Sequence, residues 1–355
     1  MISFFPGPSK IYDSVPALYA EALSEGYASI SHRSQQFMAA YGLTVAAFRS
    51  TQNLPADYQI FFTGSSTENW EILSQSLSTS GSSHLFSGAF GAKWYDYARL
   101  IHPSTQALPF GPNDDPNQLI SSISTAADLI CITQNETSNG TALDLPTMQA
   151  IRQAAGQRIV AVDVTSSCGG VEMPWALGDA WFCSVQKCFG MPAGLGLLVL
   201  SPAAIQRMRQ IDEKGRYNSL SSIVANGQKN QNAYTPNVLA IVVLGKLLQT
   251  LPNIADTATH TAQRAHMLYT WAEGQGLCTP LVTRPASRSQ TVVTCTADAQ
   301  TLPLFKEKAK QAGFQLGNGY GAWKDSTFRI ANFPAHTPQE LLDLTGALTM
   351  PVEQV

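Results

Sequence analysis

One stretch decides the fold of this chain: Ser184-Val185-Gln186-Lys187-Cys188-Phe189-Gly190-Met191-Pro192-Ala193-Gly194. An apolar run at 180–183 precedes it, and a second apolar run at 195–200 follows it. Two such runs around a turn rich in Gly and Pro predict two strands joined at an exposed tip. Partial desolvation would lower the pKa of Lys187 and make its amine a nucleophile toward carbonyls. A lone lysine after a strand is more often a solvated edge residue, so its context has to decide.

The upstream context of this lysine supplies an acid. Residues 158–162 read Arg-Ile-Val-Ala-Val, which predicts a buried strand, and Asp163 follows directly. An acid at the carboxyl end of a parallel strand faces the ligand crevice of an α/β sheet. Pyridoxal phosphate needs both groups, because a lysine bonds the cofactor and an acid keeps its pyridine nitrogen protonated.

Both stretches resemble the core of the class V aminotransferases. Residues 163–167 read Asp-Val-Thr-Ser-Ser, and residues 185–195 read Val-Gln-Lys-Cys-Phe-Gly-Met-Pro-Ala-Gly-Leu. The phosphoserine branch of that family carries a similar Asp-x-Ser-Ser followed by Ala-Gln-Lys-Asn-x-Gly-Pro-Ala-Gly, and the resemblance covers nearly the whole chain. It implies pyridoxal 5′-phosphate as cofactor, Lys187 as the catalytic residue, and Asp163 and Gln186 as cofactor-binding residues.

The composition excludes several other classes of protein. The chain has 355 residues, 44% of them hydrophobic, which is enough for a large domain and a smaller one. A net charge of −3 gives no basic footprint, so we expect neither nucleic acid nor an anionic membrane as a partner. No apolar run reaches the ~18 residues of a membrane span, and residues 1–8 do not read as a signal peptide. We therefore expect a cytoplasmic protein.

The six cysteines, at positions 131, 168, 183, 188, 278 and 295, show no CxxC spacing. This spacing favours reduced core thiols over a metal site, and we expect no metal.

A turn that suits a phosphate follows the apolar strand predicted at 58–63. Ser65 and Glu68 fit a capping box at the start of a helix. A helix N-terminus with small hydroxyl residues binds a phosphate well, although such a turn is usually only a cap. The resemblance assigns Ser66 and Thr67 to the cofactor phosphate. In the phosphoserine branch an arginine often stands where Thr67 stands here.

Two further residues are assigned to the cofactor by the resemblance. Phe90 stands between two glycines after a short strand and matches the aromatic residue that stacks on the pyridine ring. From the pattern alone, an aromatic residue there is core filler. Thr137 lies in Asn-Glu-Thr-Ser-Asn-Gly after the strand predicted at 129–133, and it matches the family residue that hydrogen-bonds the cofactor. The plain interpretation of that motif is a turn.

Two polar segments resemble parts of the family site that a second subunit completes. His32 and Arg33 lie in Ser-His-Arg-Ser, which in the family is near the substrate; otherwise this is a helix start capped by Ser34. Tyr234 and Thr235 match a turn that reaches the phosphate of the partner subunit's cofactor. The plain interpretation there is a Thr cap with Pro236 at the first helical position. The resemblance thus implies a homodimer whose active sites are shared across the interface.

Arg329 lies in a strand predicted at 327–332. A planar guanidinium binds both oxygens of a carboxylate, and Arg329 matches the family arginine that holds the substrate carboxylate. From spacing alone, a salt bridge at the rim of the protein is the commoner interpretation.

The alternation of strands and helices predicts an α/β fold with a mostly parallel sheet. The resemblance specifies it as the fold-type I architecture of pyridoxal phosphate enzymes, with helices on both faces of the sheet. We expect a large cofactor-binding domain at residues 14–249. Residues 250–355, with residues 1–13 as an N-terminal arm, would form a smaller α+β domain.

The resemblance predicts a transaminase acting on small amino and keto acids, with phosphoserine aminotransferase narrowly first. In that branch a His-Arg pair before the carboxylate-binding arginine often holds the substrate phosphate. Residues 319–324 here read Gly-Tyr-Gly-Ala-Trp-Lys, so only Lys324 could substitute there, together with His32 and Arg33 from the partner. An alanine- or serine-glyoxylate aminotransferase is therefore the alternative. A cysteine desulfurase is disfavoured because such an enzyme presents its cysteine on a distant mobile loop, whereas Cys188 adjoins Lys187. A non-catalytic homologue is disfavoured because the residues assigned to the site are all present.

Overall fold

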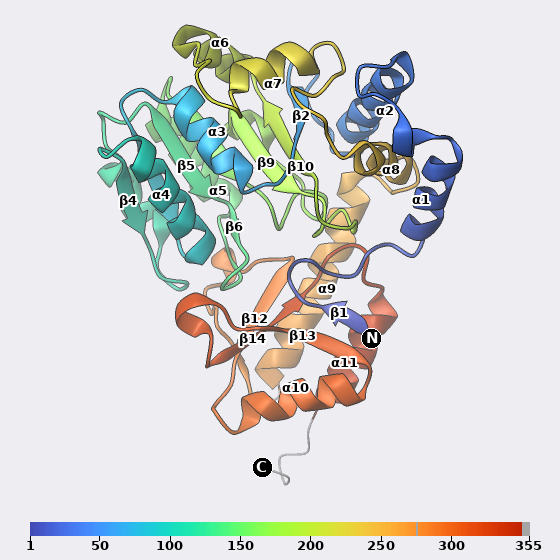
Figure 1. Cartoon of the computed structure of the whole chain (residues 1–355). Coiled ribbons are helices and arrows are strands. Elements are labelled where there is room, and N and C mark those ends of the chain that lie inside the picture. Colours follow the sequence, from blue (N-terminus) through green and yellow to red (C-terminus); the bar gives the residue numbers. More distant parts are fainter. Residues whose placement is uncertain (275, 350–355) are drawn as a thin grey trace.

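The structure is a computed structural model, and it describes residues 1–274 and 276–349 (Figure 1). No helix in these two ranges is long and apolar enough to cross a membrane. Two sheets organise the chain, and the larger one lies in the upper part of Figure 1.

The larger sheet has seven strands in the order β2-β10-β9-β8-β5-β3-β4. Their bounds are β2 Gln59–Thr63, β3 Ser82–Phe86, β4 Gln106–Pro109, β5 Leu129–Thr133, β8 Ile159–Asp163, β9 Ala180–Ser184 and β10 Gly196–Leu200. Only β10 runs antiparallel to its neighbours, β9 and β2, and the other pairs in this sheet are parallel. The predicted mostly parallel sheet and the β9–β10 hairpin around Lys187 are confirmed.

Both faces of this sheet are buried, as the strand sequences require. In β8, Ile159 and Ala161 join one apolar cluster, whereas Val160 and Val162 join the other, because successive side chains point to opposite faces. One face is covered by α3 (Glu68–Leu77), α4 (Ala89–Ile101), α6 (Pro202–Ile211) and α7 (Leu220–Gly227). The other is covered by α1 (Val15–Ser24), α2 (Gln35–Thr51), α5 (Leu145–Ala155) and α8 (Val238–Leu248).

The smaller sheet has the order β1-β13-β14-β12-β11 and packs with three helices below the first (Figure 1). Its elements are β1 Ile2–Phe4, β11 Thr279–Pro280, β12 Val292–Thr296, β13 Phe314–Asn318, β14 Thr327–Ala331, α9 Ile254–Gly274, α10 Thr301–Gln311 and α11 Pro338–Leu348. Strand β1 pairs parallel with β13, and Phe4 is fully buried in the core of this unit. The two sheets with separate cores support the division at 13/14 and 249/250, which stays a proposal; residues 275 and 350–355 lie outside the described residues.

Helix starts are where the sequence interpretation needed correction. Helix α4 begins at Ala89, directly after the strand-to-helix turn, so Phe90 lies in its first turn. At α3 only half of the predicted capping box forms. The Ser65 hydroxyl accepts from the Glu68 backbone N–H at 3.2 Å, but the Glu68 carboxylate accepts from Gly64 N, at 2.7 Å.

The predicted Thr235 cap is also wrong. Helix α8 begins at Val238, and the Asn237 side chain accepts from Ala240 N at 3.0 Å. Asn is at least as good a cap as Thr, and the helix starts where a side-chain acceptor reaches its free N–H groups. Residues Pro116–Ser122 form a 3₁₀ segment. The Ser34 cap of α2 is as predicted, and α11 begins with a capping box formed by Thr337 and Glu340.

Candidate active site

A cavity of about 210 Å³ opens at the carboxyl ends of the parallel strands β5 and β8. Thr133 and Asp163, the last residues of these strands, are register partners and both line the cavity. The structure brings a large part of the predicted site together here: Ser66, Thr67, Phe90, Thr137, Asp163, Gln186, Lys187 and Arg329 all line it. This is the position at which open α/β sheets bind ligands.

Lys187 follows β9 and reaches into this cavity from the hairpin tip. Its Nζ donates to Thr137 Oγ1 at 2.9 Å and lies 5.3 Å from the centroid of the Phe90 ring. Burial lowers the pKa of Lys187 to about 8, although the carboxylates of Asp163 and Glu136 act in the opposite direction. A lysine with a lowered pKa is neutral more often, and the neutral amine is the nucleophilic and basic form.

The N-terminal arm covers the stem of this lysine. A Cβ atom on Gly7 would lie 2.8 Å from Lys187 Cε, and the φ angle of Gly7 is +131°. The φ angle would strain any other residue here, and a Cβ atom would also displace the stem of Lys187. Phe5, Pro6 and Gly7 line the cavity, so the arm closes one of its sides.

Asp163 is buried beside the lysine. Its Oδ1 accepts from Thr165 N at 2.9 Å, and the indole N–H of Trp70 lies 3.5 Å from its Oδ2. Burial raises the pKa of Asp163, whereas the hydrogen bonds from Thr165 and the charge of Lys187 act to lower it. Within the described residues Asp163 forms no salt bridge, so this buried acid is available to a cationic ligand atom.

Hydroxyl groups gather where α3 begins. The side chains of Ser66 and Thr165 hydrogen-bond each other, and Ser66 N donates to Ser184 Oγ at 2.8 Å. Thr67 stands immediately before the helix and also lines the cavity. Hydroxyl donors at the positive end of a helix form a suitable cradle for an anion.

Arg329 closes the opposite side of the cavity, on β14 of the smaller sheet. Its Nε donates to Asn318 O at 2.7 Å and its Nη1 to Thr137 O at 2.8 Å. Burial lowers the pKa of Arg329 to about 10, with the charge of Glu136 opposing that change. No salt bridge to Arg329 occurs among the described residues, so the rim salt bridge is not what holds it. Its remaining N–H groups are available to a carboxylate.

Sequence reasoning missed Glu136, which organises one wall of the site. This fully buried carboxylate accepts from Ser138 Oγ at 2.6 Å, Ser138 N at 3.0 Å and Gly91 N at 3.1 Å. It therefore accepts hydrogen bonds from free backbone N–H groups at the start of α4, where a negative charge is favourable. These bonds fix the position of Phe90. The Asn-Glu-Thr motif drew attention to Thr137, but nothing in it indicates a helix that begins far upstream in the sequence.

Tyr320 is the second residue that the pattern did not reveal. Its ring stacks on Phe90 with centroids 5.3 Å apart and planes at 17°. Arg329 lies 5.5 Å from the Tyr320 ring centroid, on the same cavity wall. From the sequence, Tyr320 stands out only as one of residues 319–324, the segment that lacks a His-Arg pair.

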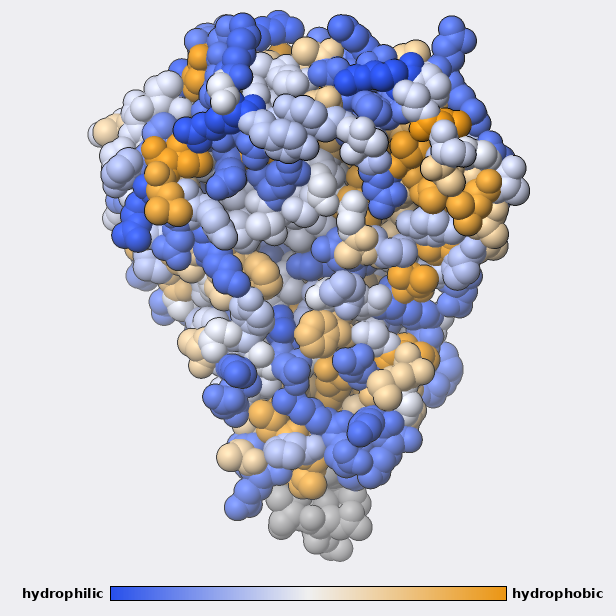
Figure 2. All heavy atoms as spheres, in the orientation of Figure 1, coloured by the Kyte–Doolittle hydropathy of each residue, from blue (hydrophilic) through white to orange (hydrophobic). Residues whose placement is uncertain are grey.

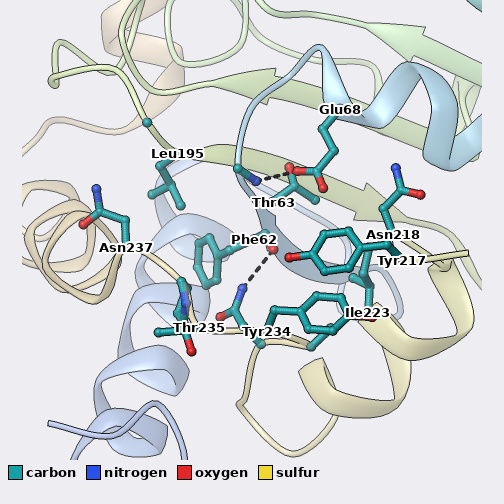
Figure 3. A pocket seen from close by; sticks show the side chains of 15 residues that line it. Phe62, Thr63, Glu68, Leu195, Tyr217, Asn218, Ile223, Tyr234, Thr235 and Asn237 are labelled. Atoms are coloured by element: carbon teal, nitrogen blue, oxygen red, sulfur yellow. Dashed lines mark hydrogen bonds between the residues drawn. The ribbon is translucent and has the colours of Figure 1, made fainter.

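Four predicted residues do not reach this cavity within one chain. Tyr234 and Thr235 line a separate cavity of about 200 Å³, shown in Figure 3. There the rings of Tyr217 and Tyr234 stack with centroids 4.1 Å apart. Arg33, beside His32, donates to Gln231 Oε1 at 2.5 Å and Asn226 Oδ1 at 2.8 Å, so it holds the chain just before Tyr234.

All six cysteines are buried free thiols, as expected. Within residues 1–274 and 276–349, no three His, Cys, Asp or Glu side chains gather into a metal-binding group.

Comparisons with known proteins agree with this geometry. The aminotransferase class-V family profile matches residues 6–312. The phosphoserine aminotransferase of Rhodococcus opacus is 29% identical over 364 residues, which cover 98% of this chain and 94% of that protein. The crystal structure of a phosphoserine aminotransferase from Cytophaga hutchinsonii superimposes with a TM-score of 0.92 at 29% identity, covering 98% of both chains. An alanine–glyoxylate aminotransferase from Nostoc has a TM-score of 0.82 at 17% identity over 98% of this chain and 94% of its own, which speaks for the fold alone.

The family match spans most of the chain and includes the lysine, the acid and the cradle at α3, whereas Tyr320 and Arg329 lie beyond the matched residues. The protein is an aminotransferase, and it belongs to the class-V aminotransferase family.

Proposed function

We propose that this chain is a phosphoserine aminotransferase that uses pyridoxal 5′-phosphate. It would convert 3-phosphohydroxypyruvate and glutamate to O-phosphoserine and 2-oxoglutarate, a step in serine biosynthesis. The proposal is supported by relatives of that name that match over nearly the full length of the chain. The observation that carries it is the convergence of Lys187, Asp163 and Arg329 on one cavity.

The residues of the cavity fit the cofactor. Within the described part of the chain, the buried Gln186 Oε1 and Thr133 Oγ1 have no hydrogen-bond partner, although such atoms are nearly always satisfied in folded proteins. Asp163 would face the ring nitrogen, and Ser66 and Thr67 the phosphate. When bound, pyridoxal phosphate supplies an electron sink for the charge that develops at the substrate α-carbon.

The residues of this chain then have separate roles. Lys187 would hold the cofactor through its Nζ and, as a free amine, would accept the proton of the substrate α-carbon and then donate it. Asp163 would stabilise a positive charge on the cofactor's ring nitrogen. Arg329 would orient the substrate by its α-carboxylate, and Phe90, held by Glu136, would pack against the ring. The Gly7 arm excludes water from the lysine.

We also propose a homodimer in which His32, Arg33, Tyr234 and Thr235 act in the active site of the partner subunit. None of these four residues lines the Lys187 cavity within one chain, which is consistent with this arrangement. Figure 2 shows apolar residues over the side of the molecule that carries α1 and α2. Leu23 and Leu43 on these helices are 51% and 61% exposed, which favours a protein partner. A cytoplasmic location stays a prediction.

One observation favours an alanine- or serine-glyoxylate aminotransferase as the second candidate. The segment before Arg329 contains no His-Arg pair for a substrate phosphate. Residues 319–324 instead bring Tyr320 into the cavity wall.

A half-reaction panel distinguishes the two functions. The purified pyridoxal form is mixed separately with phosphoserine, glutamate, alanine and serine, and the loss of pyridoxal absorption is followed. Rapid conversion by phosphoserine and glutamate supports the proposal. Conversion by alanine or serine, with phosphoserine inert, refutes it in favour of the glyoxylate-type enzyme. Borohydride reduction and peptide mapping should place the cofactor on Lys187.

A further inference from the structure

A lysine outside all the motifs above contacts a residue of the cavity wall. Lys93, one turn after Phe90 on α4, donates from its Nζ to the Tyr320 hydroxyl at 2.8 Å. The same ammonium lies 5.3 Å from the Tyr320 ring centroid and 5.7 Å from that of Phe90. Lys93 thus joins two aromatic rings that line the cavity, from segments more than 200 positions apart in sequence.

This pair has unused hydrogen-bonding capacity. An ammonium has three N–H donors, and the bond to Tyr320 uses one of them. The Tyr320 oxygen accepts that bond, so its own O–H can donate elsewhere. Lys93 is exposed, and it forms no salt bridge to an acid in the described residues. The pair therefore offers an uncompensated positive charge and several donors to an anion.

Arg329 is a second cation beside the same ring. Its guanidinium lies 5.5 Å from the Tyr320 centroid, and Lys93 Nζ lies 5.3 Å from it. Tyr320 is therefore a common neighbour of the arginine that suits an α-carboxylate and of a second cation. Two cations around one residue of the cavity wall suit a substrate that carries two anionic groups.

We propose that Lys93 and the Tyr320 hydroxyl bind the anionic group at the end of the substrate side chain, while Arg329 binds the α-carboxylate. The substrates would be amino acids whose side chain ends in a phosphate monoester or a carboxylate. This inference rests on the proposed function. It names the residues that would bind the substrate phosphate in a chain that has no His-Arg pair for that purpose.

Lys324, the candidate from sequence, is less suitable than Lys93. It follows the 3₁₀ turn Gly321–Trp323 and, like Lys93, it is exposed and does not itself line the cavity. Its side chain has no hydrogen-bond partner among the described residues, whereas that of Lys93 contacts a residue of the cavity wall. Lys324 is therefore a matched control for Lys93.

The test compares substrates on the holoenzymes of wild type, Lys93→Met, Tyr320→Phe and Lys324→Met. We expect Lys93→Met to raise KM for phosphoserine and glutamate by about 10- to 100-fold, because a hydrogen bond to a charged group is lost. The values for alanine should change by less than about 2-fold. Tyr320→Phe should raise KM for the anionic substrates several-fold with kcat nearly unchanged, and Lys324→Met should behave as wild type.

A binding measurement makes the test independent of turnover. Calorimetric titration of each holoenzyme with 3-phosphoglycerate and with glycerate, which have no amino group to transfer, compares the same acid with and without a phosphate. Wild type should prefer 3-phosphoglycerate, and Lys93→Met should lose most of that preference. Equal effects of Lys93→Met on phosphoserine, glutamate and alanine would indicate a structural role and overturn the inference.

The inference and the proposed function can fail separately. If wild type converts glutamate but not phosphoserine, the proposed function fails, and a Lys93→Met effect confined to glutamate would still support the distal site for carboxylates. If phosphoserine is a good substrate and Lys93→Met leaves its KM unchanged, the function stands and the inference is overturned.

Discussion

The loop between β2 and α3 contributes to two cavities, and these cavities differ in the charge and exposure of the side chains that line them. Thr63, Gly64 and Glu68 line the Tyr234 cavity, whereas Ser65, Ser66 and Thr67 between them line the Lys187 cavity. The Lys187 cavity is lined by the buried charged side chains of Lys187, Asp163 and Arg329. The Tyr234 cavity is lined mainly by neutral side chains, and its stacked Tyr217 and Tyr234 are 69% and 44% exposed.

The difference indicates that the Lys187 cavity suits proton transfer, whereas the Tyr234 cavity suits binding contacts. Buried charges have perturbed pKa values because desolvation penalises the ionised form, and proton transfer depends on such groups. Exposed aromatic rings with neutral polar neighbours contribute contact area instead. Substitutions in the first cavity should therefore affect the chemical step, and those in the second should affect affinity.

The largest effect is expected from Lys187→Ala. Loss of the residue proposed to bond the cofactor and to move the α-proton should lower kcat at least about 10³-fold. Transamination of glutamate is the measurement, with Thr235→Val in the other cavity as the matched variant, expected to stay within about 10-fold. Near-normal turnover by Lys187→Ala would remove the basis for assigning the chemistry to this cavity.

Asp163→Asn should come next. The amide keeps the shape of the side chain but cannot stabilise a positive ring nitrogen, so kcat should fall by about 10²- to 10³-fold. Cofactor content, measured by absorbance after gel filtration, should remain substantial because the phosphate cradle is intact. A variant that loses the cofactor but regains full rate at high cofactor concentration would mean that Asp163 acts in binding alone.

The buried charge of Lys187 should also be measurable as stability. The pKa of Lys187 falls from its ordinary value of 10.5 to about 8 in the folded chain. Between these values the unfolded chain binds more protons, so the free energy of unfolding rises with pH across that window. Below pH 8 the folded state carries the full penalty, of roughly 3 kcal/mol.

Cofactor-free Lys187→Met should therefore be more stable than cofactor-free wild type at pH 7, and the difference should vanish by about pH 10.5. Denaturant unfolding at several pH values measures it. Lys93→Met, at an exposed position, is the control for the exchange of lysine for methionine itself. A constant difference between pH 7 and pH 10.5 would contradict a lowered pKa at Lys187.

The smallest effect is expected from Arg33→Met. It removes the hydrogen bonds to Asn226 and Gln231, about 1 kcal/mol each at an exposed site, and loosens the chain before Tyr234. If the Tyr234 cavity serves a partner subunit, cofactor affinity should fall by about 3- to 10-fold, and dilution should increase the loss. Sedimentation and cofactor titration over a range of protein concentrations test this; a loss independent of concentration would place the effect within one chain.

Sequence reasoning found the residues whose chemistry is tied to a local pattern. Lys187 and Asp163 each follow an apolar strand, and the carboxyl ends of parallel strands meet at one edge, so their convergence could be predicted. Arg329, Thr137 and Ser66 were assigned by resemblance, and the fold places them on the same cavity. Helix starts were less predictable, because several Ser, Thr and Asn residues compete to cap each one.

The sequence by itself determined the α/β architecture, the lysine hairpin and the acid before it, because these depend on strand periodicity and short turns. Only the tertiary structure decided that Glu136 caps α4, that Gly7 covers Lys187, and that Lys93 meets Tyr320. Each of these contacts joins segments that lie far apart in the sequence and that the fold brings together. A side chain's local pattern carries no information on which distant backbone group, ring or cation will lie beside it.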